Sequence, residues 1–279
     1  MGGQMIVSGG NALRLYAGMT AEMERCVMHV GAGALCAGRD VVYVACDPAD
    51  VIFKMSFPAL TPMTCFAGGP GICRLLLSRD GKRLYALCRD ADSVLMLDAE
   101  SGAPLVLCRV GIAPNAMEMD DTGTVIAVAG GICEEVILLD AQNLCILKRM
   151  NTRGIVQDTL IANGKLYTLS MGDSMDAMLT AFYHESVQRR RLGGVPGALA
   201  PVSGGVAAAT QGRLYIVSGD GLRIHRLFSA PGRAARLAAA HGGMAMLDMW
   251  NDCLYIKTQA RMPWVRAAKT ARDMVWMKM

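Results

Sequence analysis

Six polar residues interrupt strand-like runs that are otherwise apolar, and their types could support chemistry. Two are arginines, three are carboxylates and one is an amide: Arg74, Glu118, Gln157, Asp158, Arg236 and Asp273. Charges in buried-looking segments need an opposite charge, water or a ligand to compensate for lost hydration. The set could therefore form mutual ion pairs or a ligand site. A small anionic or amide-bearing ligand would be held by Arg74 through charge-assisted hydrogen bonds.

Hydrolysis is one alternative chemistry, because it needs a base such as His or Glu and an arginine or metal ion that stabilises an oxyanion. The four histidines of the chain are His29, His184, His225 and His241. His184 falls in a predicted turn, His225 in an outer strand and His241 in a solvent-exposed turn. We expect scattered surface histidines, and the sequence assigns no catalytic residue.

Sulfur-containing residues could bind a soft metal ion. Eight of the 21 methionines lie toward the two ends of the chain: Met1, Met5, Met244, Met246, Met249, Met274, Met277 and Met279. Alternate residues of a strand share one face, so the MAM and MKM pairs fit core packing equally well. No CxxC pair occurs among the ten cysteines, which removes support for a zinc ribbon. The sequence predicts neither a metal site nor a cofactor.

Nucleic-acid and nucleotide binding have little support. The basic run Arg189–Arg191 has no wider basic stripe around it, and aromatic residues, which would stack on bases, make up only 5% of the chain. The glycine clusters Gly68–Gly71 and Gly193–Gly197 lack the Lys-Ser/Thr pair and the helix of a phosphate-binding loop. We expect no nucleic-acid partner and a solvated outer edge at the arginine run.

Composition and charge limit the remaining classes of protein. Apolar residues are 53% and charged residues 19% of 279, which excludes intrinsic disorder, and a net charge of +4 gives no reason to expect a polyanion. No stretch approaches 18 uninterrupted apolar residues, and the first residues lack the basic and apolar regions of a signal peptide. Most cysteines lie in apolar runs, so we expect reduced, buried thiols, a cytoplasmic location and no membrane partner.

A unit of about 40 residues recurs along the chain. Each unit has a glycine-containing turn followed by five small or apolar residues. These runs start near residues 5, 42, 84, 125, 166, 206 and 244. Two further strand-like stretches follow each run, such as Ser93–Asp98 and Pro104–Val110, and a Gly or Pro segment leads to a fourth, such as Asn115–Met119.

Four short strands per unit form the blade of a β-propeller. Seven units account for the whole chain, and the final strand-like segment, Asp273–Met279, has no unit of its own. The first run, from Met5, lacks an inner strand. Joining the two completes the first blade and removes open sheet edges. The sequence predicts an all-β, seven-bladed β-propeller with four-stranded antiparallel blades, one domain over residues 1–279, closed by its C-terminal strand.

Residues 72–129 resemble the YVTN-type β-propeller repeat. Its turn, strand, strand-ending Asp, second turn and G-x-x-P return correspond to Asp80–Lys82, Tyr85–Cys88, Asp98, Ser101-Gly102 and Gly111–Pro114. The place of its signature Asn is taken by Cys46, Cys88, Ala129 and Ser170. The resemblance covers about two blades, implies a seven-bladed propeller, and carries no particular reaction with it.

In such a propeller the six polar residues lie on the innermost strands, which border a central channel. Strand alternation predicts that Arg74, Glu118 and Gln157 share one side-chain phase and that Asp158 has the opposite phase. The leading functional hypothesis is a non-catalytic binding or scaffold propeller that recognises a protein partner or a small ligand at one face or channel mouth. The alternative is an enzyme, either a lactonase-like hydrolase or a redox-cofactor-dependent activity in the channel.

Overall fold

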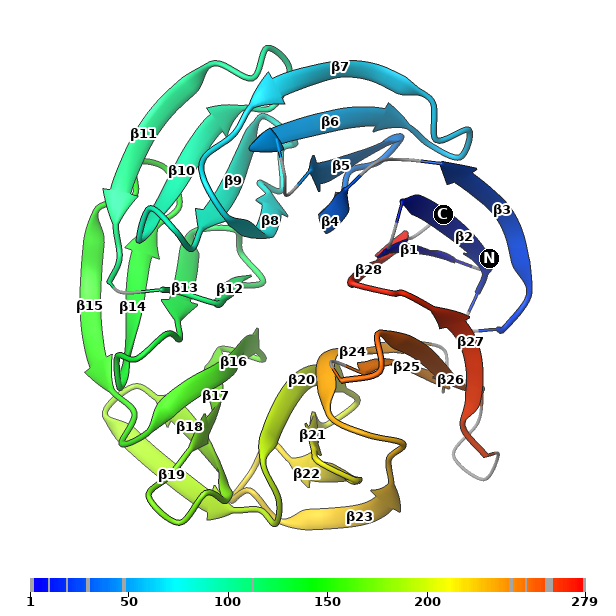
Figure 1. The fold of residues 1–279 in the computed structure, drawn as a ribbon. Helices are drawn as coiled ribbons and strands as arrows, with labels where there is room; N and C mark the ends of the chain where they lie inside the picture. The colour runs from blue at the N-terminus through cyan, green and yellow to red at the C-terminus, as the bar shows by residue number, and fades with distance from the viewer. Residues whose placement is uncertain are drawn as a thin grey trace.

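The described strands form seven four-stranded antiparallel sheets around a common axis (Figure 1). The computed structural model describes residues 3–9, 11–18, 20–28, 31–46, 49–111, 113–240, 243–248, 250–258 and 263–277. No α-helix occurs in these ranges, and hence none long and apolar enough to cross a membrane. The predicted all-β, seven-bladed propeller is confirmed.

Each blade runs from an inner strand at the axis to an outer strand at the rim. The inner strands of blades 1 to 7 are β28 (Asp273–Met277), β4 (Ala32–Ala37), β8 (Ile72–Leu77), β12 (Ala116–Met119), β16 (Ile155–Ala162), β20 (Pro196–Val202) and β24 (Ala234–Ala240). The second strands are β1 (Gln4–Gly9), β5 (Val41–Cys46), β9 (Arg83–Cys88), β13 (Val125–Ala129), β17 (Lys165–Met171), β21 (Gly205–Thr210) and β25 (Gly243–Asp248).

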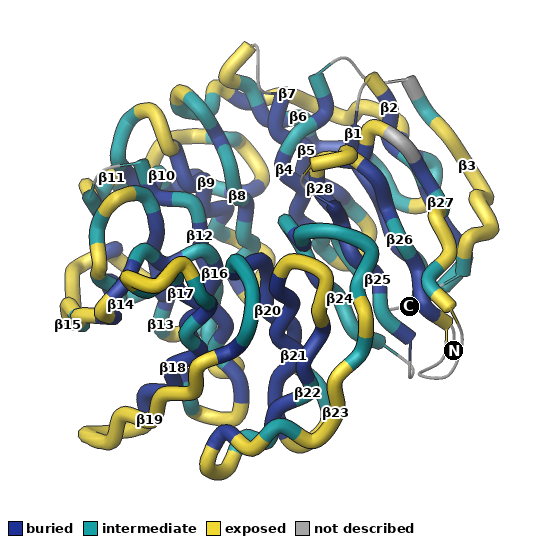
Figure 2. The backbone as a smooth tube through the Cα atoms, turned by 60° about the horizontal axis from the view of Figure 1, so that its bottom comes forward, coloured by how far each residue is buried: buried dark blue, intermediate teal, exposed yellow. Residues whose placement is uncertain are grey.

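The third and outer strands complete the blades. The third strands are β2 (Ala12–Ala17), β6 (Val51–Ser56), β10 (Ser93–Asp98), β14 (Glu135–Asp140), β18 (Ala177–Tyr183), β22 (Arg213–Ser218) and β26 (Cys253–Lys257). The outer strands are β3 (Met23–Met28), β7 (Pro62–Ala67), β11 (Pro104–Arg109), β15 (Ile146–Asn151), β19 (Ser186–Arg191), β23 (Ile224–Ser229) and β27 (Val265–Lys269). Burial falls from the inner and second strands toward the outer ones (Figure 2).

The ring closes by pairing strands from the two ends of the chain. β28 lies antiparallel to β1, with Ser8 opposite Asp273 and Gln4 opposite Met277. The sheet of blade 1 is therefore built from β28, β1, β2 and β3, and β1 is paired on both sides. This is the predicted closure.

Neighbouring blades are held together by apolar packing and by buried tyrosines that reach across the interface. Tyr43 donates from its hydroxyl to the carbonyl of Ala99 at 2.9 Å, and Tyr85 donates to that of Ala141 at 2.5 Å. Both acceptors follow the aspartate that ends the third strand of the next blade. The second strand of a repeat therefore supplies a tyrosine, and the turn after the third strand of the next repeat supplies the carbonyl that accepts from it.

Five inner strands, β4, β8, β16, β20 and β24, carry a bulge near their first residues. In β16, for example, Val156 lies opposite Ser170 and Asp158 lies opposite Leu169, so Gln157 is an extra residue without a partner of its own. A bulge bends the strand and changes which face the following side chains take. The bulges therefore decide which side chains reach the channel.

Candidate functional site

A single inner-strand position carries four of the six predicted residues. Counted back from the turn that joins the inner to the second strand, Asp273, Arg74, Asp158 and Arg236 occupy the same place in blades 1, 3, 5 and 7. The same place in blades 2, 4 and 6 holds Ala34, Ala116 and Ala198. We call these seven residues the channel ring. Around it, charged residues alternate with alanines except between blades 7 and 1, where Arg236 and Asp273 are neighbours.

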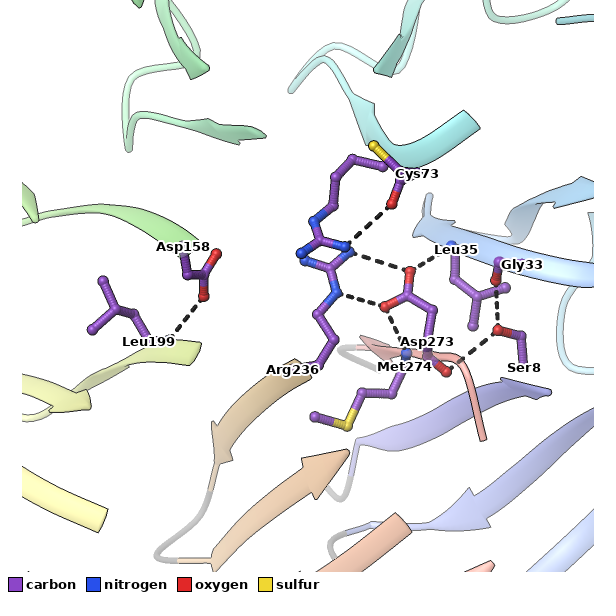
Figure 3. A network of polar contacts seen from close by, with 10 residues as sticks. Ser8, Gly33, Leu35, Cys73, Asp158, Leu199, Arg236, Asp273 and Met274 are labelled. Carbon is purple, nitrogen blue, oxygen red and sulfur yellow. Dashed lines mark hydrogen bonds and ion pairs between the residues drawn. The ribbon is translucent and has the colours of Figure 1, made fainter. Parts of the chain in front are cut away.

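Asp273 is the most heavily bonded member of the channel ring (Figure 3). The Arg236 guanidinium donates to both of its oxygens, with Nε to Oδ1 at 2.7 Å and Nη2 to Oδ2 at 3.3 Å. Its carboxylate also accepts from the backbone N–H of Leu35 at 2.8 Å and of Met274 at 2.9 Å. Burial alone would lower the pKa of Arg236, but Asp273 outweighs it and the pKa is raised.

Asp158 repeats the backbone part of this arrangement in blade 5 (Figure 3). It accepts from the N–H of Leu199 in blade 6 at 2.8 Å and from the N–H of Thr159 at 3.0 Å. Burial raises its pKa, while Arg74 and the two backbone donors act in the opposite direction. Both ring aspartates thus join one inner strand to the next. Their main role in this geometry is to hold blades together.

Arg74 stands in a different environment from Arg236, although the two residues are equivalent. Its guanidinium donates to the carbonyl of Cys73 at 3.2 Å, and its buried Nε has no hydrogen-bond partner. It takes part in none of the ion pairs between described residues. Burial and the nearby positive charge of Arg236 lower the pKa of Arg74. The group is therefore a cation with unused donors.

The predicted side-chain phases are wrong for Gln157 and Asp158, whereas Arg74 and Glu118 share one phase as predicted. Strict alternation grouped Gln157 with Arg74 and Glu118 and set Asp158 apart. A bulge inserts Gln157 as an extra residue before Asp158, and an equivalent bulge inserts Cys73 before Arg74. Arg74 therefore corresponds to Asp158, Gln157 corresponds to Cys73, and Glu118 lies further along the channel.

Glu118 lies near the mouth at which the inner strands end, which we call the strand-end mouth. It is half-buried and has no hydrogen-bond or ion-pair partner among the described residues. Burial and the nearby Asp158 carboxylate raise its pKa to about 7, against the opposing effect of Arg236 and Arg74. At neutral pH this carboxyl exchanges readily between its protonated and ionised forms.

Glu118 lines a cavity of about 440 Å³ at the strand-end mouth. The wall combines charged side chains with apolar ones, including Asp158, Arg236, Leu160 and Leu237. An adjoining cavity of about 500 Å³ shares Asp121, Ala162, Pro201 and Ala239 with it and extends over blades 5 to 7. Volumes of this size are typical of small-ligand sites.

The opposite mouth, where the inner strands begin, has a smaller cavity, and we call it the strand-start mouth. Its cavity has a volume of about 100 Å³. Arg74, Gln157, Asn115, Arg89 and Arg233 supply its polar wall. The structure thus separates the six predicted residues. Asp158, Arg236 and Asp273 are bonded within the channel ring, Arg74 and Gln157 line this mouth, and Glu118 lines the other.

Sequence reasoning missed Arg79 at the strand-end mouth and Arg89 and Arg233 at the strand-start mouth. All three lie in turns next to inner or second strands rather than within them, so a search of the strand-like runs passed over them. The available signal was their position: residues just before or just after an inner strand, or just after a second strand, border a channel mouth.

The other residues considered for chemistry lie away from the channel. His184 occupies a turn with a φ of 51°, and His225 is exposed on β23, while His29 and His241 lie outside the described residues. Arg189–Arg191 form an exposed part of β19. Within the described ranges no three His, Cys, Asp or Glu side chains gather as metal ligands.

The sulfur-containing residues mostly pack in the core. Met5, Met246, Met274 and Met277 are buried, and Met244 is half-buried; Met1, Met249 and Met279 lie outside the described residues. The ten cysteines form no disulfide, and four are buried: Cys36, Cys46, Cys88 and Cys253. The prediction of mostly buried thiols was too broad, because three are exposed: Cys26, Cys65 and Cys145. Each of these lies on or beside an outer strand.

Solved structures with the same architecture include proteins of different kinds. A functionally unknown protein from Desulfotomaculum acetoxidans is 8% identical, with 99% of each chain covered and a TM-score of 0.81. Kuenenia stuttgartiensis hydrazine synthase is 11% identical, with 90% of each chain covered and a TM-score of 0.75. The β-propeller domain of Myceliophteria thermophila Cps50 (Swd1) is 12% identical, with 92% of this chain and 96% of that chain covered and a TM-score of 0.70.

The comparisons establish the class of fold of this protein. No family model matches the chain, and no curated protein matches its sequence. The structural likenesses have low identity, so they show the fold alone: the protein is a seven-bladed β-propeller. The YVTN-type repeat stays a prediction.

Proposed function

We propose that the protein is a non-catalytic binding propeller that recognises a small ligand at the strand-end mouth. The observation that carries the proposal is Glu118, a channel carboxyl that lines a cavity of about 440 Å³ and has no partner among the described residues. The remaining charges of the wall are largely satisfied, since Arg236 is paired with Asp273 and Asp158 accepts two backbone N–H groups.

The chemistry of the wall defines the ligand class. Four carboxylates border this cavity, Glu118, Asp120, Asp121 and Asp158, against two arginines, Arg79 and Arg236. Most of the other lining residues of this cavity are apolar, including Met119, Leu160, Ile161, Pro201 and Leu237. A molecule with an ammonium group and an apolar body fits this combination, with the ammonium donating to ionised Glu118.

Calorimetric titration with benzylamine, benzyl alcohol and benzoate at pH 8 tests the proposal. Benzylamine should bind at least about tenfold more tightly than the alcohol or the acid, because only the ammonium forms a charge-assisted hydrogen bond. Glu118→Gln should remove that preference, and Glu185→Gln, a change of an exposed glutamate in a turn, should retain it. Equal affinity for the three probes, or an unchanged preference in Glu118→Gln, contradicts the proposal.

A second candidate, a hydrolase, is favoured by one property of the same residue. A carboxyl with a pKa of about 7 is suited to act as a general base near neutral pH. Hydrolysis of an aryl lactone followed at constant pH distinguishes this candidate. Turnover that rises through pH 7 and is lost in Glu118→Gln would favour the enzyme over the binding protein.

A further inference from the structure

Three arginines from separate parts of the chain meet at the strand-start mouth. Arg74 comes from β8, Arg89 follows the end of β9, and Arg233 precedes β24. All three line the same cavity of about 100 Å³, and no carboxylate is part of its wall. This mouth therefore has the opposite charge character to the mouth that contains Glu118.

None of these guanidinium groups is neutralised by a carboxylate in an ion pair between described residues. Arg233 donates from Nε to the carbonyl of Pro196 at 3.1 Å and from Nη2 to Oε1 of Gln157 at 3.3 Å. Arg74 donates to the carbonyl of Cys73, and its Nε has no partner. A guanidinium has five N–H donors, so both arginines have donors left over.

One neutral side chain of the cavity, Gln157, also offers a donor, whereas the buried Oδ1 of Asn115 is an acceptor without a partner. Because Oε1 of Gln157 accepts from Arg233, the Nε2 amide group of Gln157 is left as a donor. Burial lowers the pKa of both Arg74 and Arg233, although Asp273 and Asp158 act in the opposite direction on Arg74. An added negative charge would compensate both.

We propose that the strand-start mouth is a binding site for a small oxyanion group, a carboxylate or a tetrahedral oxyanion such as phosphate. Guanidinium groups match the oxygen spacing of these anions and bind them with two parallel hydrogen bonds. The cavity has the volume of roughly three water molecules, which suits one such group rather than a larger ligand. The site lies at the opposite end of the channel from the proposed amine site and does not depend on it.

Calorimetric titration at constant ionic strength, with sodium phosphate, sulfate and acetate in turn and chloride as the reference, tests the site. At least one oxyanion should bind saturably where chloride does not, and the preferred anion identifies the ligand as tetrahedral or planar. Arg233→Ala and Arg74→Met should each weaken binding by about tenfold or more, because each removes charged hydrogen bonds. Arg89→Ala should weaken it less, since Arg89 is exposed.

Two further variants keep the result interpretable. Arg190→Ala removes an exposed arginine of β19 far from both mouths, and Glu118→Gln alters the other mouth; both should bind the oxyanion as the unmodified chain does. Because Arg89 is exposed, Arg89→Ala tests the site even if Arg74→Met does not fold. The absence of saturable binding by all three oxyanions, or unchanged affinity in both Arg89→Ala and Arg233→Ala, would overturn the proposal.

Discussion

At the scale of single residues, Arg236 and Arg74 occupy equivalent positions in their blades but differ in what surrounds them. Arg236 forms a two-pronged ion pair with Asp273, whereas Arg74 has a backbone carbonyl and an unpartnered Nε. The difference follows from the neighbouring blade, because blade 7 adjoins blade 1 and its aspartate, while both neighbours of blade 3 carry alanine. Of these two equivalent arginines, Arg236 thus stabilises the fold, while Arg74 keeps donors for the proposed ligand.

Replacing Asp273 with alanine should destabilise the fold strongly. The substitution leaves the Arg236 charge without its partner and removes the acceptor of two backbone N–H groups, one of them in blade 2. Removing one partner of a buried pair costs about 3–5 kcal/mol in the free energy of unfolding. Urea denaturation measures the change. Asp220→Ala, which breaks an exposed pair with Lys165, should cost less than about 1 kcal/mol, and a similar cost for both variants would contradict the structural role.

Glu118 should make stability depend on pH. Its folded-state pKa of about 7 lies above the unfolded value of 4.5, so the folded state holds the proton more tightly than the unfolded state does. The free energy of unfolding therefore falls as pH rises from about 4.5 to about 7 and is unaffected by this group above that range. The full loss is about 3 kcal/mol.

Comparison with Glu118→Gln isolates this contribution. Urea denaturation at pH 5 and pH 8 should show a larger loss of stability in the unmodified chain than in the variant. Parallel pH profiles for the two proteins would show that the Glu118 carboxyl titrates normally.

At the scale of strands and turns, the sequence was sufficient for the architecture but not for the channel. Glycine turns and alternating apolar runs predict which segments pair, because strand pairing depends on features that repeat every 40 residues or so. The bulges leave no comparable mark: Cys73, Gln157 and Ala235 share no residue type, yet each is the extra residue of its inner strand. Their effect on side-chain direction had to come from the structure, and so did Arg89 and Arg233.

Gly102 illustrates how a turn of the repeat depends on its tertiary contact. Its φ is 72°, and a Cβ at this position would overlap the ring of Phe66 in the adjacent blade. Gly164 has a φ of 70° with nothing near its own Cβ position. Gly102→Ala should therefore cost about 1–3 kcal/mol more than Gly164→Ala in the free energy of unfolding, because only the former adds a steric clash to the same backbone strain. Equal costs by urea denaturation would show that Phe66 moves aside freely.

At the scale of the whole molecule, each blade packs against the next, so the stability of the ring depends on the pairing of β28 with β1 that closes it. β28 contributes the inner strand of blade 1, and Met274 and Met277 are buried in two different interfaces. Removing this strand exposes apolar surface on both sides of the seam.

Deletion of residues 273–279 should yield insoluble protein or a large drop in melting temperature. Besides losing its inner strand, blade 1 loses the aspartate that bonds to blade 2 and to Arg236. Adding a synthetic peptide of residues 271–279 to the truncated chain should restore part of the lost stability by refilling the strand. An unchanged melting curve after deletion would rule out closure by β28.

The number of blades, seven, is odd, and this affects the charge pattern of the channel ring. With an even number of blades, every second blade could carry a charged ring residue without exception. With seven blades the alternation is interrupted once, and here two charged residues become neighbours. That single defect falls between blades 7 and 1, and because the signs also alternate, the two neighbours are Arg236 and Asp273 and attract one another. Asp273 lies on β28, the strand that pairs with β1 and so joins the two ends of the chain within blade 1. An odd blade number thus places an attractive ion pair between blades 7 and 1, and this pair anchors β28, the inner strand that no peptide bond connects to the other strands of its own blade.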